Sequence, residues 1–259
     1  MTDVQEMTDT KKRIDYIKSL EIAEPSDEIR ELDLSGAAAA EDHDGEASGY
    51  VADGSLVSFV SDVGTQAQQD VLNSTLLAQL AANKKYDRFE DTENWYKMYV
   101  EVLGKIGWVI ESFDFQKYSK SGDTVRVQDV VIKLLGAIAT QNGMAIFGET
   151  LEALEALSDD DGRLVLFDTQ GEDLGKGNFQ AGIANETNGV VSFSVGAFHF
   201  TSEEHTTRFL WFGYSSTRMK LFQSNQKATL NESVYNQVRQ TVIDKLGDSA
   251  ETYIGDLEI

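Results

Sequence analysis

Residues 179–200, FQAGIANETNGVVSFSVGAFHF, decide the fold class of this chain. Apolar side chains recur at every second position around residues 188–189, an Asn-Gly pair that is typical of tight β-hairpin turns. The alternation holds over 191–195 and changes phase at Phe198, which one extra residue in a β-bulge near Gly196 would explain. The stretch therefore predicts two long antiparallel strands.

Two shorter apolar runs extend the predicted sheet. RFLWFGY at 208–214 is apolar on both faces, which is typical of a central strand covered by helices on both sides. LVLF at 164–167 lies between turn-forming residues, as expected of a buried strand. Met219 and Leu221 begin a further strand, so the C-terminal half predicts an antiparallel meander.

Helical periodicity dominates the preceding part of the chain. Apolar residues recur at helical spacing over 62–82 and 91–106. Residues 126–157 predict a helical hairpin that breaks at its Asn-Gly pair, residues 142–143. A last helix begins after Thr229, which heads a Thr-x-x-Glu capping box. This order predicts an α+β fold with an antiparallel β-meander sheet flanked by amphipathic helices.

The N-terminal 52 residues predict a disordered acidic tail ahead of a single domain at 53–259. Fifteen acidic and five basic residues fall in the first sixty positions, and SGAAAAEDHDGEASG at 35–49 has almost no bulky apolar side chain. A short helix over 10–22 offers one apolar face for docking on a protein partner. The docking residues are Ile14, Ile17 and Leu20. A tail that is merely solvated is the alternative, and homo-oligomerisation is a further expectation.

Composition excludes several classes of protein. The chain has 259 residues, no cysteine and a formal net charge of −22, so disulfides, thiolate metal sites and iron–sulfur clusters are absent. The charge opposes binding to nucleic acid, whose affinity comes mostly from Lys and Arg. No apolar run is long enough for a transmembrane helix, and the charged start is unlike a Sec signal peptide. We therefore expect a cytoplasmic protein, or one released by a route that needs no such signal.

No group of residues in the sequence has the spacing of a known catalytic or metal site. His199 and His205 flank two glutamates, but their spacing does not match a zinc motif. The acidic run 159–161 lacks the first and last ligands of a calcium-binding loop. Nucleophile-elbow and phosphate-loop motifs are also missing. We expect no enzyme activity, no catalytic residue, no cofactor and no metal.

One stretch within the predicted helical hairpin has an unusual composition. Residues 134–148, LLGAIATQNGMAIFG, carry no charge in a chain that is 25% charged. Such a hairpin could leave a soluble fold and enter a bilayer after a trigger, of which low pH is favoured because it neutralises carboxylates. The candidates for insertion are Leu134, Leu135, Ile138, Ile146 and Phe147. The alternative is a buried helix pair, in which case Ala137→Asp should unfold the protein.

No residue-level motif assigns the chain to a family. In layout, its helix pairs, long antiparallel meander and terminal helix resemble the bacterial Cyt-type cytolysins and related virulence factors. This resemblance implies a membrane-active protein. Two functions are therefore considered, a non-enzymatic interaction or assembly protein that docks through its N-terminal tail, and a soluble pore-forming protein that inserts the 134–148 hairpin.

Overall fold

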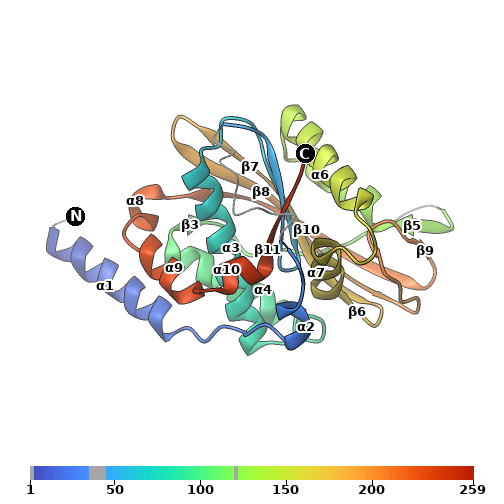
Figure 1. Ribbon diagram of the computed structural model, residues 1–259, viewed down its shortest axis with the longest axis horizontal. Helices are drawn as coiled ribbons and strands as arrows, with labels where there is room; N and C mark the ends of the chain where they lie inside the picture. Colours follow the sequence, from blue (N-terminus) through green and yellow to red (C-terminus); the bar gives the residue numbers. More distant parts are fainter. Residues whose placement is uncertain (1–2, 35–44, 120–121) are drawn as a thin grey trace.

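The computed structural model describes residues 3–34, 45–119 and 122–259, with side chains from residue 9 onward. Its fold is α+β, with helices on both faces of a central sheet (Figure 1). The strands are β1 (Ser48–Ala52), β2 (Ser55–Phe59), β3 (Trp108–Val109), β4 (Gln116–Lys117), β5 (Thr124–Arg126), β6 (Glu172–Asp173), β7 (Lys176–Thr187), β8 (Val190–Ser202), β9 (Gly213–Ser215), β10 (Met219–Leu230) and β11 (Ile254–Leu257). The helices are α1 (Asp3–Ser19), α2 (Asp27–Arg30), α3 (Thr65–Lys85), α4 (Thr92–Ile106), α5 (Val127–Gly136), α6 (Gln141–Ala156), α7 (Gly162–Gly171), α8 (Glu232–Tyr235), α9 (Arg239–Leu246) and α10 (Ser249–Tyr253).

The sheet is mixed rather than purely antiparallel. Its strand order is β11-β1-β2-β7-β8-β10-β3, and the long strands β7, β8 and β10 form the predicted antiparallel meander. β2 and β7 pair in parallel, with Ser55 opposite Gln180. All the helices from α3 to α7 separate these two strands, and a connection of that length permits parallel pairing.

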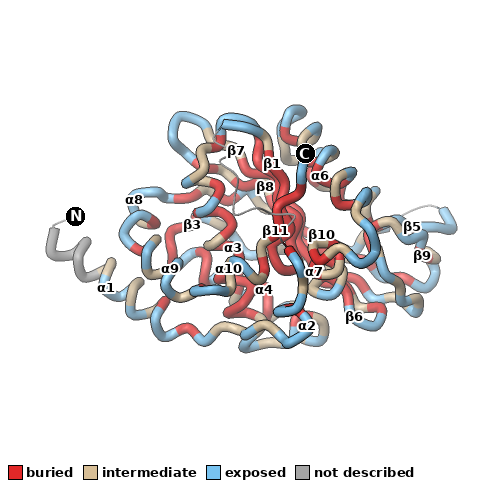
Figure 2. The backbone as a smooth tube through the Cα atoms, in the orientation of Figure 1, coloured by how far each residue is buried: buried red, intermediate tan, exposed pale blue. Residues whose placement is uncertain are grey.

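Two serines of β2, three positions apart, identify the two helical layers. Ser55 Oγ donates to Gln79 Oε1 of α3 at 3.1 Å, whereas Ser58 Oγ donates to Thr150 Oγ1 of α6 at 2.7 Å. Because side chains alternate between the faces of a strand, α3 and α6 cover opposite faces of the sheet. Figure 2 shows the strands as the most continuously buried part of the chain between these layers.

The β7–β8 hairpin forms as predicted, but it contains no bulge. Its register runs without interruption from Lys176 opposite Thr201 to Thr187 opposite Val190. The predicted bulge near Gly196 is therefore wrong. The change of apolar phase arises because both faces are covered, and Phe198 stacks on Phe179 on the face opposite to Val195.

The predicted strand at 164–167 is a helix. It forms the middle of α7, whose N-cap Asp161 accepts a hydrogen bond from the backbone N–H of Arg163 at 2.9 Å. A four-residue apolar run fits a buried strand and a buried helix equally well, so the cap decides between them.

The predicted central strand at 208–214 is also wrong. Residues 209–211 form a turn, and only Gly213–Ser215 pair as β9, with β5. Phe209 is fully buried because its ring stacks on Phe167 of α7 at 5.3 Å. The stretch is apolar because a loop, rather than a strand, packs into the core there.

The ends of two helices differ from those predicted. α5 and α6 do form a hairpin, but the chain turns at 137–140, and Thr140 caps α6 by accepting from Gly143 N at 3.1 Å. A Cβ on Gly143 would lie 2.9 Å from Ile183 Cγ2, so this glycine permits close packing rather than a turn. Thr229 lies in β10, and Asn231 caps α8 instead.

Candidate functional site

The α5–α6 hairpin contains the uncharged stretch and lies on one face of the sheet (Figure 1). Of the five insertion candidates, Leu135 and Phe147 are fully buried, whereas Leu134, Ile138 and Ile146 are partly buried. Ala137 is exposed at the turn between the helices. The predicted unfolding of Ala137→Asp therefore loses its basis, because a carboxylate at this position would remain in water.

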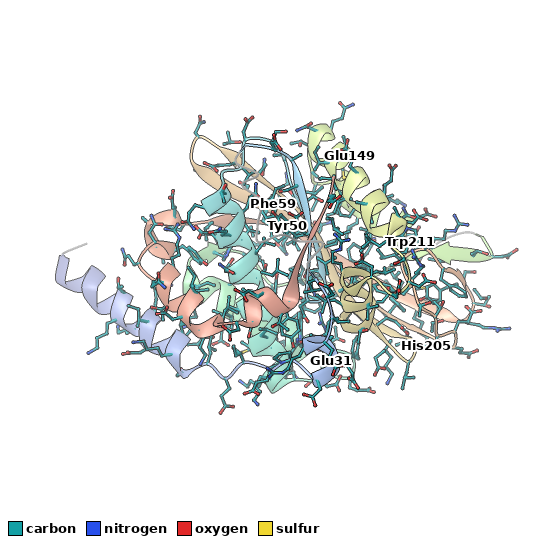
Figure 3. All side chains as sticks on the ribbon, viewed as in Figure 1. Glu31, Tyr50, Phe59, Glu149, His205 and Trp211 are labelled. Carbon is teal, nitrogen blue, oxygen red and sulfur yellow. The ribbon has the colours of Figure 1, made fainter. Side chains whose placement is uncertain are left out.

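α6 approaches the sheet closely through small residues. Gly49 of β1 faces Thr150, and a Cβ on this glycine would lie 2.7 Å from Thr150 Cγ2. On the neighbouring strand, Ser58 makes the hydroxyl hydrogen bond to Thr150 described above. Glu149 is on the outer side of the same helix and is exposed (Figure 3). α6 is thus amphipathic, with one face buried against the sheet and the opposite face exposed to solvent.

The turn of the hairpin is packed less tightly than its helices. A cavity of about 220 Å³ lies between Ile138, Ala139 and Thr140 of the turn and the polar end of the sheet. Ser192 and Ser194 line the cavity on the sheet side. The hydrogen bonds described for the turn are local, from the backbone N–H groups of residues 137–139 to carbonyls in the last turn of α5.

Arg208 binds the C-terminal end of the hairpin. Its guanidinium donates from Nη1 to the Glu155 carbonyl at 2.9 Å, from Nη2 to the Leu157 carbonyl at 2.5 Å, and from Nε to Asp159 Oδ1 at 2.6 Å. Carbonyls at a helix C-terminus lack intrahelical partners, and a cation there also complements the helix dipole. Arg208 adopts a positive φ of 57°, which few non-glycine residues favour. We call this set of contacts the Arg208 clasp.

Asp168 of α7 holds the backbone of Arg208 in place. Its Oδ2 accepts a hydrogen bond from the backbone N–H of Arg208 at 2.5 Å. Burial raises the pKa of Asp168 to about 6, nearby Glu172 adds to the shift, and the hydrogen bond from Arg208 opposes it. The carboxyl of Asp168 therefore titrates nearer to neutrality than an exposed aspartate does.

The structure does not bring the two candidate histidines together. His199 stacks on Phe222 with 4.6 Å between ring centroids and meets Phe115 edge-on, and burial lowers its pKa to about 4. His205 lies in the loop after β8, and its Nδ1 is 3.1 Å from Glu172 Oε1. Within the described ranges, no three His, Asp or Glu side chains are placed to hold a metal ion.

The three predicted docking residues lie on α1 and just beyond it. Ile17 is fully buried and Leu20 nearly so, while Ile14 is partly buried. α1 packs against α4 and α9 of the same chain, so these side chains contribute to the protein's own core. β1 also lies within the first 52 residues, and it pairs with β2 and β11 in the sheet. Most of the proposed linker, residues 35–44, lies outside the described residues.

Sequence reasoning missed the Arg208 clasp. Arg208 is 40 residues from Asp168 and 49 to 53 residues from its partners around the end of α6, so no local pattern connects them. The one available signal was a charged residue at the start of an otherwise apolar run.

Comparison with known proteins gives only distant likenesses. No protein-family model and no curated protein sequence matches the chain. A delta-endotoxin structure is 10% identical, with 68% of this chain and 79% of that chain covered and a TM-score of 0.39. The activated Cyt2Ba monomer from Bacillus thuringiensis subsp. israelensis is 9% identical, with 67% and 96% covered and a TM-score of 0.41. The Evf virulence factor is 14% identical, with 86% and 88% covered and a TM-score of 0.32. We base no functional conclusion on likenesses of this size.

Proposed function

We propose that the protein acts on lipid bilayers without enzymatic chemistry, and that the uncharged tip of the α5–α6 hairpin, residues 134–148, is the segment that enters the lipid. The observation that supports this most is the combination of sequence and position: the uncharged stretch 134–148 forms the exposed turn of a two-helix unit on the surface of the sheet. Charged side chains are the main cost of entering a bilayer, and this stretch has none.

The hairpin can move without breaking the sheet. Its two helices are contiguous in the chain and contain no strand, so the pairings between β1, β2, β7, β8 and β10 do not depend on it. Leaving the sheet would expose buried side chains such as Leu135 and Phe147, at about 1.5–3 kcal/mol each in water. Burial of the same side chains in lipid would offset that cost.

The lengths of the helices limit the mode of action. At about 1.5 Å per residue, α5 and α6 extend about 15 and 24 Å, whereas the hydrocarbon core of a bilayer is about 30 Å thick. No helix in the described part of the chain is long and apolar enough to cross a membrane. We therefore propose that the hairpin enters the interface and one leaflet, and that several copies together perturb the bilayer.

Dye release from liposomes tests this function, and a charge at the turn makes the test specific. Ala137 is exposed at the turn, so Ala137→Asp should fold normally but lose most release activity, because the turn is the part of the hairpin that enters the lipid deepest and a charged side chain there opposes entry. Ser233→Asp, at an exposed position of α8 away from the hairpin, is the matched control and should keep full activity. Equal release by both variants would exclude the hairpin as the inserting segment.

Protein–protein assembly through the N-terminal segment is the second candidate. Its support is the position of α1, which runs along the outside of the molecule and extends past the other helices at its N-terminal end (Figure 1). Because Ile17 and Leu20 pack internally, a partner or a second copy of the chain would contact the outer face of α1. Sedimentation of the full chain over a range of concentrations tests self-association, and a strictly monomeric chain would leave only a foreign partner.

A further inference from the structure

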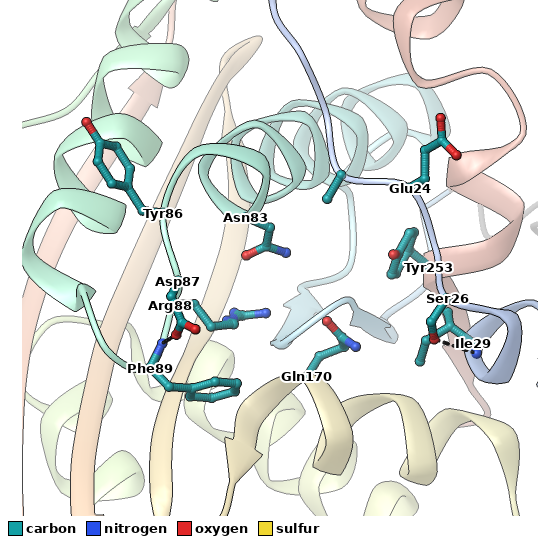
Figure 4. A pocket seen from close by; sticks show the side chains of 11 residues that line it. Glu24, Ser26, Ile29, Asn83, Tyr86, Asp87, Arg88, Phe89, Gln170 and Tyr253 are labelled. Atoms are coloured by element: carbon teal, nitrogen blue, oxygen red, sulfur yellow. Dashed lines mark hydrogen bonds between the residues drawn. The ribbon is translucent and has the colours of Figure 1, made fainter.

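The cavity in Figure 4 has a buried arginine in its wall that is already used by the fold. The cavity has a volume of about 310 Å³ and lies between the segment before α2, the end of α3 and α10. The Arg88 side chain is only 5% exposed, its Nη1 pairs with Asp53 Oδ2 at 2.8 Å, and its guanidinium lies over the Trp95 ring. This ion pair therefore joins the β1–β2 turn to the loop after α3, and the cavity gives a ligand no access to the charge.

Two carboxylates of a different kind lie beneath residues 203–208, the segment that follows β8 and ends at the Arg208 clasp. We call this segment the 203–208 loop. Asp168 Oδ2 accepts a hydrogen bond from the backbone N–H of Arg208 at 2.5 Å, and Glu172 Oε1 lies 3.1 Å from His205 Nδ1. The Glu172 side chain is only 4% exposed. Both carboxylates thus hold the loop from its buried side.

The closed loop brings negative charges together. Asp168 and Glu172 lie one turn apart at the C-terminal end of α7, where the helix dipole disfavours carboxylates. Glu204 of the loop is also close, since burial and these three carboxylates together raise the pKa of Tyr214. Among the described residues, neither Asp168 Oδ1 nor the Tyr214 hydroxyl has a hydrogen-bond partner. The closed position is therefore costly while the carboxylates are ionised.

The basic residues of the loop, Arg208 and His205, oppose this repulsion unequally. The guanidinium of Arg208 is already engaged by the end of α6 and by Asp159. His205 is a cation only when it is protonated, and it would then attract Glu172. Proton uptake by either His205 or Asp168 therefore favours the closed loop. The charged or titratable groups around the two carboxylates are Asp159, Asp173, Glu204, His205, Arg208 and Tyr214.

The loop can lift while the rest of the domain stays folded. Residues 203–208 contain no helix or strand, and Glu203, His205 and Thr207 are exposed. The next two residues, Phe209 and Leu210, are buried in the core and give the loop a fixed end. Lifting the loop about this end would withdraw the Arg208 clasp from α6.

We propose that the 203–208 loop is a pH-sensitive latch, which protonation keeps closed over Asp168 and Glu172 and which ionisation at higher pH allows to open, so that the Arg208 clasp leaves α6. Burial raises the pKa of Asp168 to about 6, which brings the change near neutrality. The consequence rests on the proposed membrane function: the hairpin becomes easier to release as the pH rises. This direction is opposite to the low-pH trigger expected from the overall charge.

Hydrogen exchange of the Arg208 amide, followed by NMR, reports the closed loop directly, because this N–H donates to Asp168. If opening restores the ordinary pKa of 3.8 to Asp168, the protection factor should fall about tenfold from pH 5 to pH 8, after correction for the intrinsic exchange rate. Urea below about 1 M should not change it, since local opening exposes little surface. Equal protection at both pH values, or a dependence on urea as steep as that of core amides, would overturn the proposal.

Two substitutions identify the groups that act. Asp168→Asn keeps an oxygen for the Arg208 N–H but removes the charge, so protection should be high and vary less than about threefold between pH 5 and pH 8. His205→Gln changes an exposed residue and should lower protection about two- to threefold at pH 5 and leave it unchanged at pH 8. A full tenfold change that persists in Asp168→Asn would contradict the latch.

Dye release from phosphatidylcholine liposomes separates the latch from the membrane function. The parent should release dye up to about tenfold faster at pH 8 than at pH 5, in proportion to the open population, and Asp168→Asn should release slowly at both. Faster release at pH 5 would overturn the link between the loop and the hairpin. Absence of release at every pH would refute the membrane function, and the exchange of the Arg208 amide would still decide whether the latch exists.

Discussion

Ser58 Oγ of β2 lies 2.7 Å from Thr150 Oγ1 of α6, and both residues are fully buried. Thr150 Oγ1 also donates to the Ile146 carbonyl one turn earlier, at 2.9 Å. This hydroxyl pair joins the proposed membrane-active hairpin to the centre of the sheet. A neutral hydrogen bond of this kind fixes the orientation of α6 on β2 but contributes only about 0.5–1.5 kcal/mol. A contribution of this size is compatible with the proposed release of the hairpin from the sheet.

Removing one partner of this pair should destabilise the protein more than removing both. Thr150→Val keeps the side-chain shape but leaves Ser58 Oγ buried without its acceptor, at a cost of about 1–3 kcal/mol. The double variant Thr150→Val with Ser58→Ala removes the unpaired group and should recover part of that loss. Urea unfolding of the two single variants and the double variant measures the coupling, and strictly additive losses would mean that the hydroxyls do not interact.

The Arg208 clasp should control how readily the hairpin opens. Arg208→Asn tolerates the positive φ but removes three contacts to the end of α6. Amides in the last turn of α6 should then exchange about tenfold faster or more, since each hydrogen bond to a charged group contributes about 1.5–3 kcal/mol. Unchanged exchange in that turn would show that packing alone holds the helix.

The stability contribution of Asp168 should change in the direction opposite to that of ordinary acid denaturation. Its pKa is raised to about 6 in the folded protein, so the folded state binds this proton more tightly than the unfolded state. Its contribution to the free energy of unfolding therefore rises as pH falls through about 6, and becomes constant below the ordinary pKa of the carboxyl. Asp168→Asn should be more stable than the parent at pH 8 and lose this advantage progressively as the pH falls from about 6 to about 4. Parallel stability curves for the two proteins would contradict the shift.

The contribution of His199 to stability should change with pH in the direction opposite to that of Asp168. Burial lowers its pKa to about 4, so the unfolded chain binds the proton more tightly and stability falls as pH drops from about 6.5 toward 4. His199→Phe keeps a ring between Phe115 and Phe222 and should remove this loss. Melting temperatures between pH 7 and pH 4 measure the difference, and an equally steep decline in the variant would assign the acid sensitivity elsewhere.

The long strands and the helix pair could be predicted because their apolar residues repeat over many positions. β7, β8 and α4 follow their sequence periods, and the turn at 188–189 is the one that the Asn-Gly pair indicates. α7 could not be predicted from four apolar residues. The 208–214 run was misassigned because a buried loop can be as apolar as a central strand.

Less of the candidate site than of the fold could be predicted from neighbouring residues in the sequence. The uncharged stretch was visible in the sequence, and the structure gives it a surface position. The contacts that govern it were not visible, because Ser58 and Thr150 are 92 residues apart. Asp53 and Arg88 are 35 residues apart and meet only because the β1–β2 turn lies against the loop after α3.

A reversible covalent lock tests the central claim most directly. Since the chain has no cysteine, Ser58→Cys with Thr150→Cys would introduce a single disulfide that fixes α6 to β2. Ser55→Cys with Gln180→Cys would join two strands of the sheet and leave the hairpin free, as the control. In liposome dye release, the account predicts that the first variant is inactive when oxidised and recovers on reduction, while the control is active in both states. Full release by the oxidised Ser58–Thr150 variant would contradict it.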